Sequence, residues 1–133
     1  MDIFRNSVMM SMLFVFVGGG LGAVSRWTLS LYLNKAWPAV QYGTLLANLI
    51  GGFIIGVAVF FFSSRPEIAP EWRLFCITGF LGGLTTFSTF SSEVVQLLEK
   101  GHITLGLATV AANLFGSLFL TFLGLLCGRF IFK

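Results

Sequence analysis

The sequence predicts an all-helical membrane protein with four transmembrane helices, and two observations support this fold class. Of the 133 residues, 56% are hydrophobic and 10% are charged, whereas a soluble domain carries about 25% charged residues. The apolar residues also form four long runs, near residues 7–33, 43–62, 73–98 and 103–130. Each run reaches the roughly 20 residues that a helix needs to cross the hydrocarbon layer. We therefore expect one transmembrane domain over residues 1–133.

The first run is interpreted as a retained helix. It follows Arg5 as a secretory signal would, but it lacks a small-residue cleavage site and stays apolar through Ala23. The later connections contain turn residues, among them Pro38, Pro66 and Gly101. Amphipathic aromatic residues lie near the ends of the runs, where the membrane interface favours them: Trp27, Tyr32, Trp37, Tyr42 and Trp72.

Basic residues are almost balanced between the two sides of the predicted bundle. The side with both termini and the second loop holds five, namely Arg5, Arg65, Arg73, Arg129 and Lys133. The other side holds Lys35 and Lys100, with Arg26 as a third if it extends outward. This bias weakly favours cytoplasmic termini and permits insertion in both orientations, so an antiparallel homodimer is possible. Because most charges flank apolar runs, they do not indicate nucleic-acid binding.

The third run contains a pattern that disfavours a continuous helix. Gly79, Gly82 and Gly83 lack a Cβ atom, and the hydroxyls of Thr85 and Thr86 compete for backbone hydrogen bonds. We expect a break near the middle of this helix, at residues 82–85. In lipid, the backbone groups freed by a break cost several kcal/mol each unless protein, water or an ion satisfies them.

The second run carries polar residues on one helix face. Thr44 and Asn48 are four residues apart, and Gly52 and Gly56 continue the same stripe with small residues. Two interpretations of Asn48 stay open at this point. Its side chain either forms hydrogen bonds between packed helices or offers its NH₂ donors to a polar pathway.

The fourth run repeats this pattern with Thr109, Asn113, Ser117 and Thr121, each four residues apart. They form a slowly turning polar ladder about 18 Å long. Helix packing or a polar pathway would explain it equally well. The ladder contains no acid or base, which argues against a proton-coupled transporter, since such proteins place titratable groups inside their spans.

The few charged residues near the spans receive simple interpretations. We expect Glu93 near the interface and paired with a basic residue, and His102 solvated in a loop. Arg26 is expected to extend toward the interface, or to add positive potential at a vestibule that attracts anions.

Two aromatic residues follow the predicted break. Phe87 and Phe90 lie one helical turn apart, and a phenyl ring is electropositive at its edge. Taken alone, such a pair is most simply explained by packing. Beside neutral hydroxyl and amide donors, however, ring edges could replace part of the hydration shell of a small anion without trapping it.

At these residues the sequence resembles the Fluc (also called CrcB) fluoride channel family, over essentially the whole chain. The most specific segments are residues 79–91, which read GFLGGLTTFSTFS and precede Glu93, and residues 43–49, which read GTLLANL. The early Gly22, Arg26 and Trp27 and the late Gly116-Ser117 pair agree with the family.

The resemblance implies a dual-topology, antiparallel homodimer with two pores that export fluoride passively across the bacterial plasma (inner) membrane. It implies that Phe87, Phe90 and Asn48 contact fluoride and that Ser117 and Thr121 lie on a polar track. Asn113 and Thr109 occupy further positions of this track, and Thr44 and Asn113 are counted among the expected pore residues. It also implies a central, structural Na⁺ held by backbone carbonyls of Gly82 and Thr85 from both subunits.

Two alternatives from other classes are a small dual-topology coupled transporter and a membrane assembly subunit without transport activity. An enzyme is not expected, because the sequence contains no Ser/His/Asp constellation and no cluster of metal-ligand residues.

Overall fold

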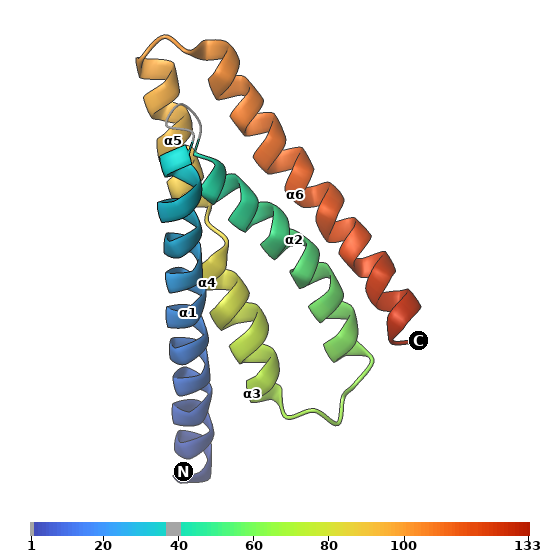
Figure 1. Cartoon of the computed structure of the whole chain (residues 1–133). Coiled ribbons are helices and arrows are strands. Elements are labelled where there is room, and N and C mark those ends of the chain that lie inside the picture. Colours follow the sequence, from blue (N-terminus) through green and yellow to red (C-terminus); the bar gives the residue numbers. More distant parts are fainter. Residues whose placement is uncertain (1, 37–40) are drawn as a thin grey trace.

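The computed structural model describes residues 2–36 and 41–133, and Figure 1 shows its long helices joined by short connections. Within these ranges, four helical spans are long and apolar enough to cross a membrane. They are Arg5–Lys35, Tyr42–Ser63, Pro70–Glu99 and Ile103–Ile131. The four predicted spans are therefore confirmed as helices. The predicted interface residue Trp37 lies outside the described residues.

Three of the spans are continuous helices and the third is not. The continuous ones are α1 (Asp2–Ala36), α2 (Tyr42–Ser63) and α6 (Ile103–Ile131). The third span consists of α3 (Pro70–Arg73), η1 (Leu74–Leu81), α4 (Gly82–Leu84) and α5 (Phe87–Glu99). The segment η1 is a π-helix, whose wider turns were not expected from the sequence and are frequent near functional sites.

The break predicted in the third span is confirmed, but different residues make it. Gly82 and Gly83 lie inside the short helix α4. The extended residues are Thr85, with ψ 154°, and Thr86, with ψ 127°. The break expected at residues 82–85 therefore begins three residues later and ends one residue later, because hydroxyl-bearing residues and not the glycines leave the helix.

The glycines allow close contact between helix backbones. A Cβ atom on Gly22 of α1 would lie 2.0 Å from the Phe80 carbonyl oxygen, and one on Gly83 would lie 2.4 Å from the Gly19 carbonyl oxygen. We call this contact of α1 with η1 and α4 the first glycine seam. A second seam joins α2 and α6, where a Cβ on Gly56 would lie 2.2 Å from the Thr121 carbonyl oxygen. Glycine is required at each seam because the neighbouring atoms are backbone.

Figure 1 shows the resulting arrangement, in which α2 and α6 run side by side and α1 lies along η1 and α4. Between α2 and η1 an apolar cleft of about 350 Å³ contains Phe61, Phe80 and Phe132 in its walls. The buried core is small and consists of Ala47, Leu81 and Leu84, with partly buried residues around it. Large apolar side chains cover the outside instead, as a chain in lipid or against another chain requires.

Candidate functional site

The break in the third span is held by the side chain of Asn48 from α2. Its Oδ1 atom accepts a hydrogen bond of 2.8 Å from the Thr86 backbone N–H, and its Nδ2 atom donates to the Thr86 carbonyl at 3.0 Å. Nδ2 also donates to Oδ1 of Asn113 at 2.9 Å. One amide side chain thus satisfies both backbone groups of an extended residue. These bonds offset part of the free-energy cost of opening a helix at membrane depth.

Thr86 also begins the helix that follows the break. It is the N-cap of α5, and its hydroxyl accepts a hydrogen bond of 3.2 Å from the Thr89 backbone N–H. A threonine before an apolar helical run is a common N-terminal signal. This signal was present in the sequence and would have placed the break one residue later than predicted.

Asn113 is the ladder residue that reaches the break. Its side chain is 4% exposed, and its Nδ2 atom donates to the Thr109 carbonyl at 3.0 Å. Thr109 instead bonds back to the Leu105 carbonyl within its own helix. Ser117 and Thr121 lie against Gly52 of α2. The C-terminal part of the ladder therefore follows the second glycine seam.

Phe87 and Phe90 occupy the first turn of α5, and their rings meet edge to face. The ring centroids are 5.5 Å apart and the planes are inclined by 72°. Phe90 is 8% exposed, whereas Phe87 is 78% exposed and projects away from the subunit. The two rings therefore have different surroundings in one subunit, although the sequence presents them as an equivalent pair.

A groove of about 320 Å³ brings most of the predicted pore residues together. It lies between α2, α6 and the break, and combines amide and hydroxyl groups with aromatic rings and aliphatic side chains. The predicted residues in its wall are Asn48, Phe87, Phe90, Asn113, Ser117 and Thr85. Thr44 and Thr121 are not among the residues that line it.

Thr44 of α2 contacts a carboxylate of the third span, that of Glu93. Its hydroxyl donates a hydrogen bond to Oε1 of Glu93, and both residues are buried, at 1% and 9% exposure. Glu93 was expected to pair with a basic residue, but the partner of its carboxylate is the Thr44 hydroxyl. The rotation of α5 after the break turns Glu93 inward, toward α2.

Arg26 of α1 also reaches the break. Its Nε atom donates to the Gly83 carbonyl at 3.2 Å, and its Nη1 atom donates to the Thr89 hydroxyl at 3.3 Å. The side chain is half-buried. The guanidinium therefore points at the third span, a contact that neither interpretation of Arg26 from the sequence had included.

Two backbone carbonyls at the break lose the partners that a continuous helix would give them. In such a helix the Thr86 and Thr89 N–H groups would donate to the carbonyls of Gly82 and Thr85. Here these N–H groups donate to Asn48 and to the Thr86 hydroxyl. The two carbonyls are therefore available as hard oxygen donors, which suit a hard cation such as Na⁺.

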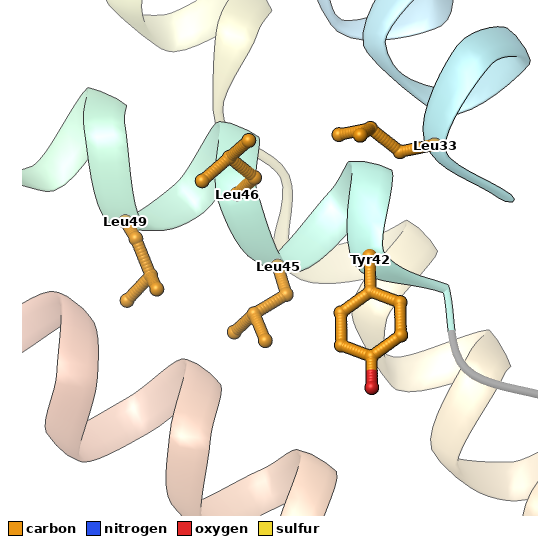
Figure 2. A pocket seen from close by; sticks show the side chains of 5 residues that line it. All are labelled: Leu33, Tyr42, Leu45, Leu46 and Leu49. Carbon is orange, nitrogen blue, oxygen red and sulfur yellow. The ribbon is translucent and has the colours of Figure 1, made fainter. Parts of the chain in front are cut away.

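A second pocket, of about 430 Å³, lies elsewhere and differs in character. Figure 2 shows Leu45 and Leu49 pointing toward one side of α2, with Tyr42 beside them and Leu33 approaching from α1. Leu46 completes its wall. Apart from the tyrosine hydroxyl, its lining side chains offer only aliphatic and aromatic carbon, so it is poorly suited to replace the hydration shell of an ion. Polar groups converge at the break and not here.

Comparison with known proteins shows the family of the chain. A family model described as "CrcB-like protein, Camphor Resistance (CrcB)" matches residues 13–125, a range that contains all the residues discussed at the break. The chain belongs to this family. Its four long apolar helical spans make it a multi-pass membrane protein.

Curated relatives of this chain carry the name "Fluoride-specific ion channel FluC". The protein from Pseudomonas putida (strain W619) is 54% identical over 121 residues, which are 91% of this chain and 95% of the relative. The protein from Ralstonia pickettii (strain 12J) is 57% identical over 115 residues, or 86% of this chain and 91% of the relative. The protein from Ralstonia nicotianae (strain ATCC BAA-1114 / GMI1000) is 58% identical over 111 residues, or 84% and 88%. The resemblance noted in the sequence is thereby confirmed.

Proposed function

We propose that this channel conducts fluoride passively through a pathway at the break of the third span. The observation that carries the proposal is the groove in which Asn48, Asn113 and Ser117 lie beside Phe87 and Phe90. Amide and hydroxyl donors can replace water around a small anion. Aromatic ring edges add weak positive potential without a fixed charge that would hold the ion. Fluoride would then be bound strongly enough to enter the pathway and weakly enough to leave it, as conduction requires.

The remaining predicted residues extend this pathway along the bundle. Thr44 lies one turn before Asn48 on α2, and Thr121 lies one turn beyond Ser117 on α6. Thr121 supplies a hydroxyl donor that continues the polar track away from the groove, and Thr44 joins the track only when its hydroxyl turns away from Glu93. Arg26 adds positive potential on the side of the break that faces α1, where it favours the arrival of anions at a vestibule.

The working unit of the proposal is an antiparallel, dual-topology homodimer. In one subunit the groove is open, Phe87 is 78% exposed, and Gly82 of α4, before the break, is exposed. Lipid against this face would leave polar groups without partners at a cost of several kcal/mol each. A second copy in the opposite orientation would cover it, and the near balance of basic residues in the loops allows both orientations.

A structural Na⁺ is part of the proposed dimer. The carbonyls of Gly82 and Thr85 would hold it, because their helical N–H partners donate elsewhere. When bound, the ion would supply a positive charge beside the pathway that attracts anions without any ionisable side chain. The proposed location is the bacterial inner membrane, where passive flow along the gradient would lower fluoride in the cytoplasm.

Fluoride efflux from liposomes containing the purified protein, followed with a fluoride electrode, tests the conduction. We expect fast fluoride release that persists when a protonophore abolishes the proton gradient, and no comparable release of chloride. Slow release that stops without a proton gradient would instead indicate a coupled transporter. Absence of release from protein that is folded and inserted would favour the assembly-subunit alternative.

Accessibility labelling tests the antiparallel dimer separately. Cys76 and Cys127 are first replaced by alanine, and one new cysteine is placed at Lys100, in an exposed turn. We expect a membrane-impermeant maleimide to label about half of the chains from outside intact spheroplasts, and the rest only after lysis. An Arg65→Cys control in the exposed loop on the opposite side should give the same half. Complete labelling at one position and none at the other would contradict dual topology.

A further inference from the structure

We propose that Arg26 is a positioning residue that fixes the geometry of the break through two hydrogen bonds. This role goes beyond an electrostatic contribution at a vestibule, and it does not depend on the dimer or on the cation. The charge of a vestibule residue acts at a distance, whereas a brace requires donors at fixed positions. The two roles therefore predict different results for a substitution that keeps the charge but changes the shape.

The position of Arg26 follows from the first glycine seam. Arg26 lies four residues after Gly22 and so shares its helix face. At Gly22 the backbones of α1 and the third span approach so closely that a Cβ atom would lie 2.0 Å from the Phe80 carbonyl oxygen. This approach places the start of the Arg26 side chain beside α4. The guanidinium can then use Nε, its innermost nitrogen, to reach the Gly83 carbonyl at 3.2 Å.

The two acceptors of Arg26 lie on opposite sides of the break. Gly83 belongs to α4, before the extended residues, and Thr89 belongs to α5, after them. A guanidinium is planar, so bonds from Nε at 3.2 Å and from Nη1 at 3.3 Å fix the distance and direction between the two helical segments. Arg26 therefore spans the gap that Thr85 and Thr86 open.

This brace complements the contact made by Asn48. Asn48 approaches from α2 and satisfies the backbone of Thr86, which lies within the break. Arg26 approaches from α1 and joins the two segments on either side. The Thr86 hydroxyl links the two contacts, because it donates to the Thr89 hydroxyl at 3.1 Å. Phe87, directly after the break, and Phe90, next to Thr89, are therefore oriented by both.

A half-buried arginine that bonds only to neutral acceptors is costly in a membrane span and usually has a role there. Both side-chain hydrogen bonds of Arg26 go to such acceptors, a carbonyl and a hydroxyl. Lysine would keep the charge, but its single ammonium group has no planar fork. An Arg26→Lys variant therefore separates charge from geometry, and Arg26→Gln removes both.

The experiment measures two quantities in purified channels: the initial fluoride efflux rate, and the hydrogen–deuterium exchange of the peptide that contains residues 82–89. We expect Arg26→Lys and Arg26→Gln to reduce efflux by about tenfold or more, the size associated with losing a hydrogen bond to a charged group. Exchange should accelerate in this peptide and not in α2 or α6. Neither effect should depend on ionic strength, since the bonds are not screened as a distant charge is. Arg129→Lys, at an exposed position near the end of α6, is the matched control and should behave like wild type.

Retention of wild-type efflux and exchange in Arg26→Lys, with a salt-dependent loss in Arg26→Gln, would overturn the brace and leave only the charge. If both variants fail to fold, the acceptor side gives the answer. Thr89→Ser keeps the hydroxyl that Nη1 contacts, and Thr89→Val removes it. Faster exchange of residues 82–89 in Thr89→Val than in Thr89→Ser supports the brace, and equal exchange in the two contradicts it.

Discussion

The first glycine seam and the Thr85–Thr86 break are neighbours in the third span, and both contain residues that disfavour a regular helix. At the seam, Gly79 and Gly83 remain helical and their missing side chains let α1 approach the backbone. At the break, Thr85 and Thr86 are extended, and Asn48 bonds to the exposed backbone. The seam is a contact between two backbones, whereas the break is filled by side chains from the other three spans.

This difference indicates how a membrane helix can be interrupted while its backbone polar groups keep hydrogen-bond partners. The opening lies one residue after a rigid contact with α1, so the segment before it is fixed. Arg26 of α1 and Asn48 of α2 then bond to backbone groups that have lost helical hydrogen bonds, and Asn113 of α6 accepts a hydrogen bond from the Asn48 side chain. The polar site is consequently narrow and surrounded by apolar packing, which is what a pathway for a small ion in lipid requires.

The largest expected effect is that of adding one methyl group to the seam. In Gly22→Ala the new Cβ would lie 2.0 Å from the Phe80 carbonyl oxygen and 2.8 Å from the Leu84 nitrogen. Both are backbone atoms, so the helices must separate, at a cost of at least roughly 1–3 kcal/mol. We expect little monodisperse protein in size-exclusion chromatography and no measurable fluoride efflux.

Gly20→Ala is the matched control, because a Cβ atom there would have nothing within 4 Å. We expect normal yield and normal efflux from this variant. If Gly22→Ala showed the same yield and efflux as Gly20→Ala, the close backbone contact between α1 and the third span would be contradicted.

An intermediate effect is expected at the break from Asn48→Ala. The substitution leaves the Thr86 N–H and carbonyl and the Asn113 Oδ1 atom without their partner. Each unsatisfied buried group costs roughly 1–3 kcal/mol. We expect a lower melting temperature and a loss of fluoride efflux of more than tenfold in the fraction that folds.

Asn34→Ala is a suitable comparison for Asn48→Ala, since Asn34 also accepts a backbone hydrogen bond near the start of α2, from Gly43 at 2.9 Å. It should reduce stability by about 1 kcal/mol and leave efflux intact. Equal losses of efflux in the two variants would mean that Asn48 acts through general stability alone.

The smallest effect is expected from Thr86→Val, which keeps both backbone bonds to Asn48 but removes the hydroxyl that caps α5. Loss of such a cap costs about 1 kcal/mol. We expect a small decrease in melting temperature and a few-fold decrease in efflux, with Thr86→Ser close to wild type. A loss as severe as that of Asn48→Ala would show that the hydroxyl, and not the backbone contact, is the main support of the break.

The spans and the existence of a break in the third one could be predicted because they depend on local properties. Four long apolar runs fix the helices, and the Thr85-Thr86 pair before Phe87 is a local helix-start signal. The four-residue spacing of Thr44 and Asn48 also predicts that they share one face of α2. These inferences need no knowledge of how the helices pack.

The partners across helices could not be predicted, because they depend on the rotation of each helix. The π-helical turns of η1 change the phase of the third span before α5 begins. This phase decides that Glu93 faces Thr44 and that Thr89 faces Arg26. The same limit applies to the meeting of Asn48 with Asn113, which lie 65 residues apart in sequence.

The most direct test of the central claim is the fluoride efflux of channels altered only at the aromatic rings beside the break. Phe87→Ile and Phe90→Ile keep apolar volume but remove the electropositive ring edge, and Phe115→Ile changes an exposed ring on α6 that is 66% exposed and lies away from the groove. We predict that the first two variants lose efflux by about tenfold or more while remaining monodisperse, and that Phe115→Ile retains it. Wild-type efflux and intact cellular fluoride resistance in both Phe87→Ile and Phe90→Ile would contradict the claim that fluoride passes at the break.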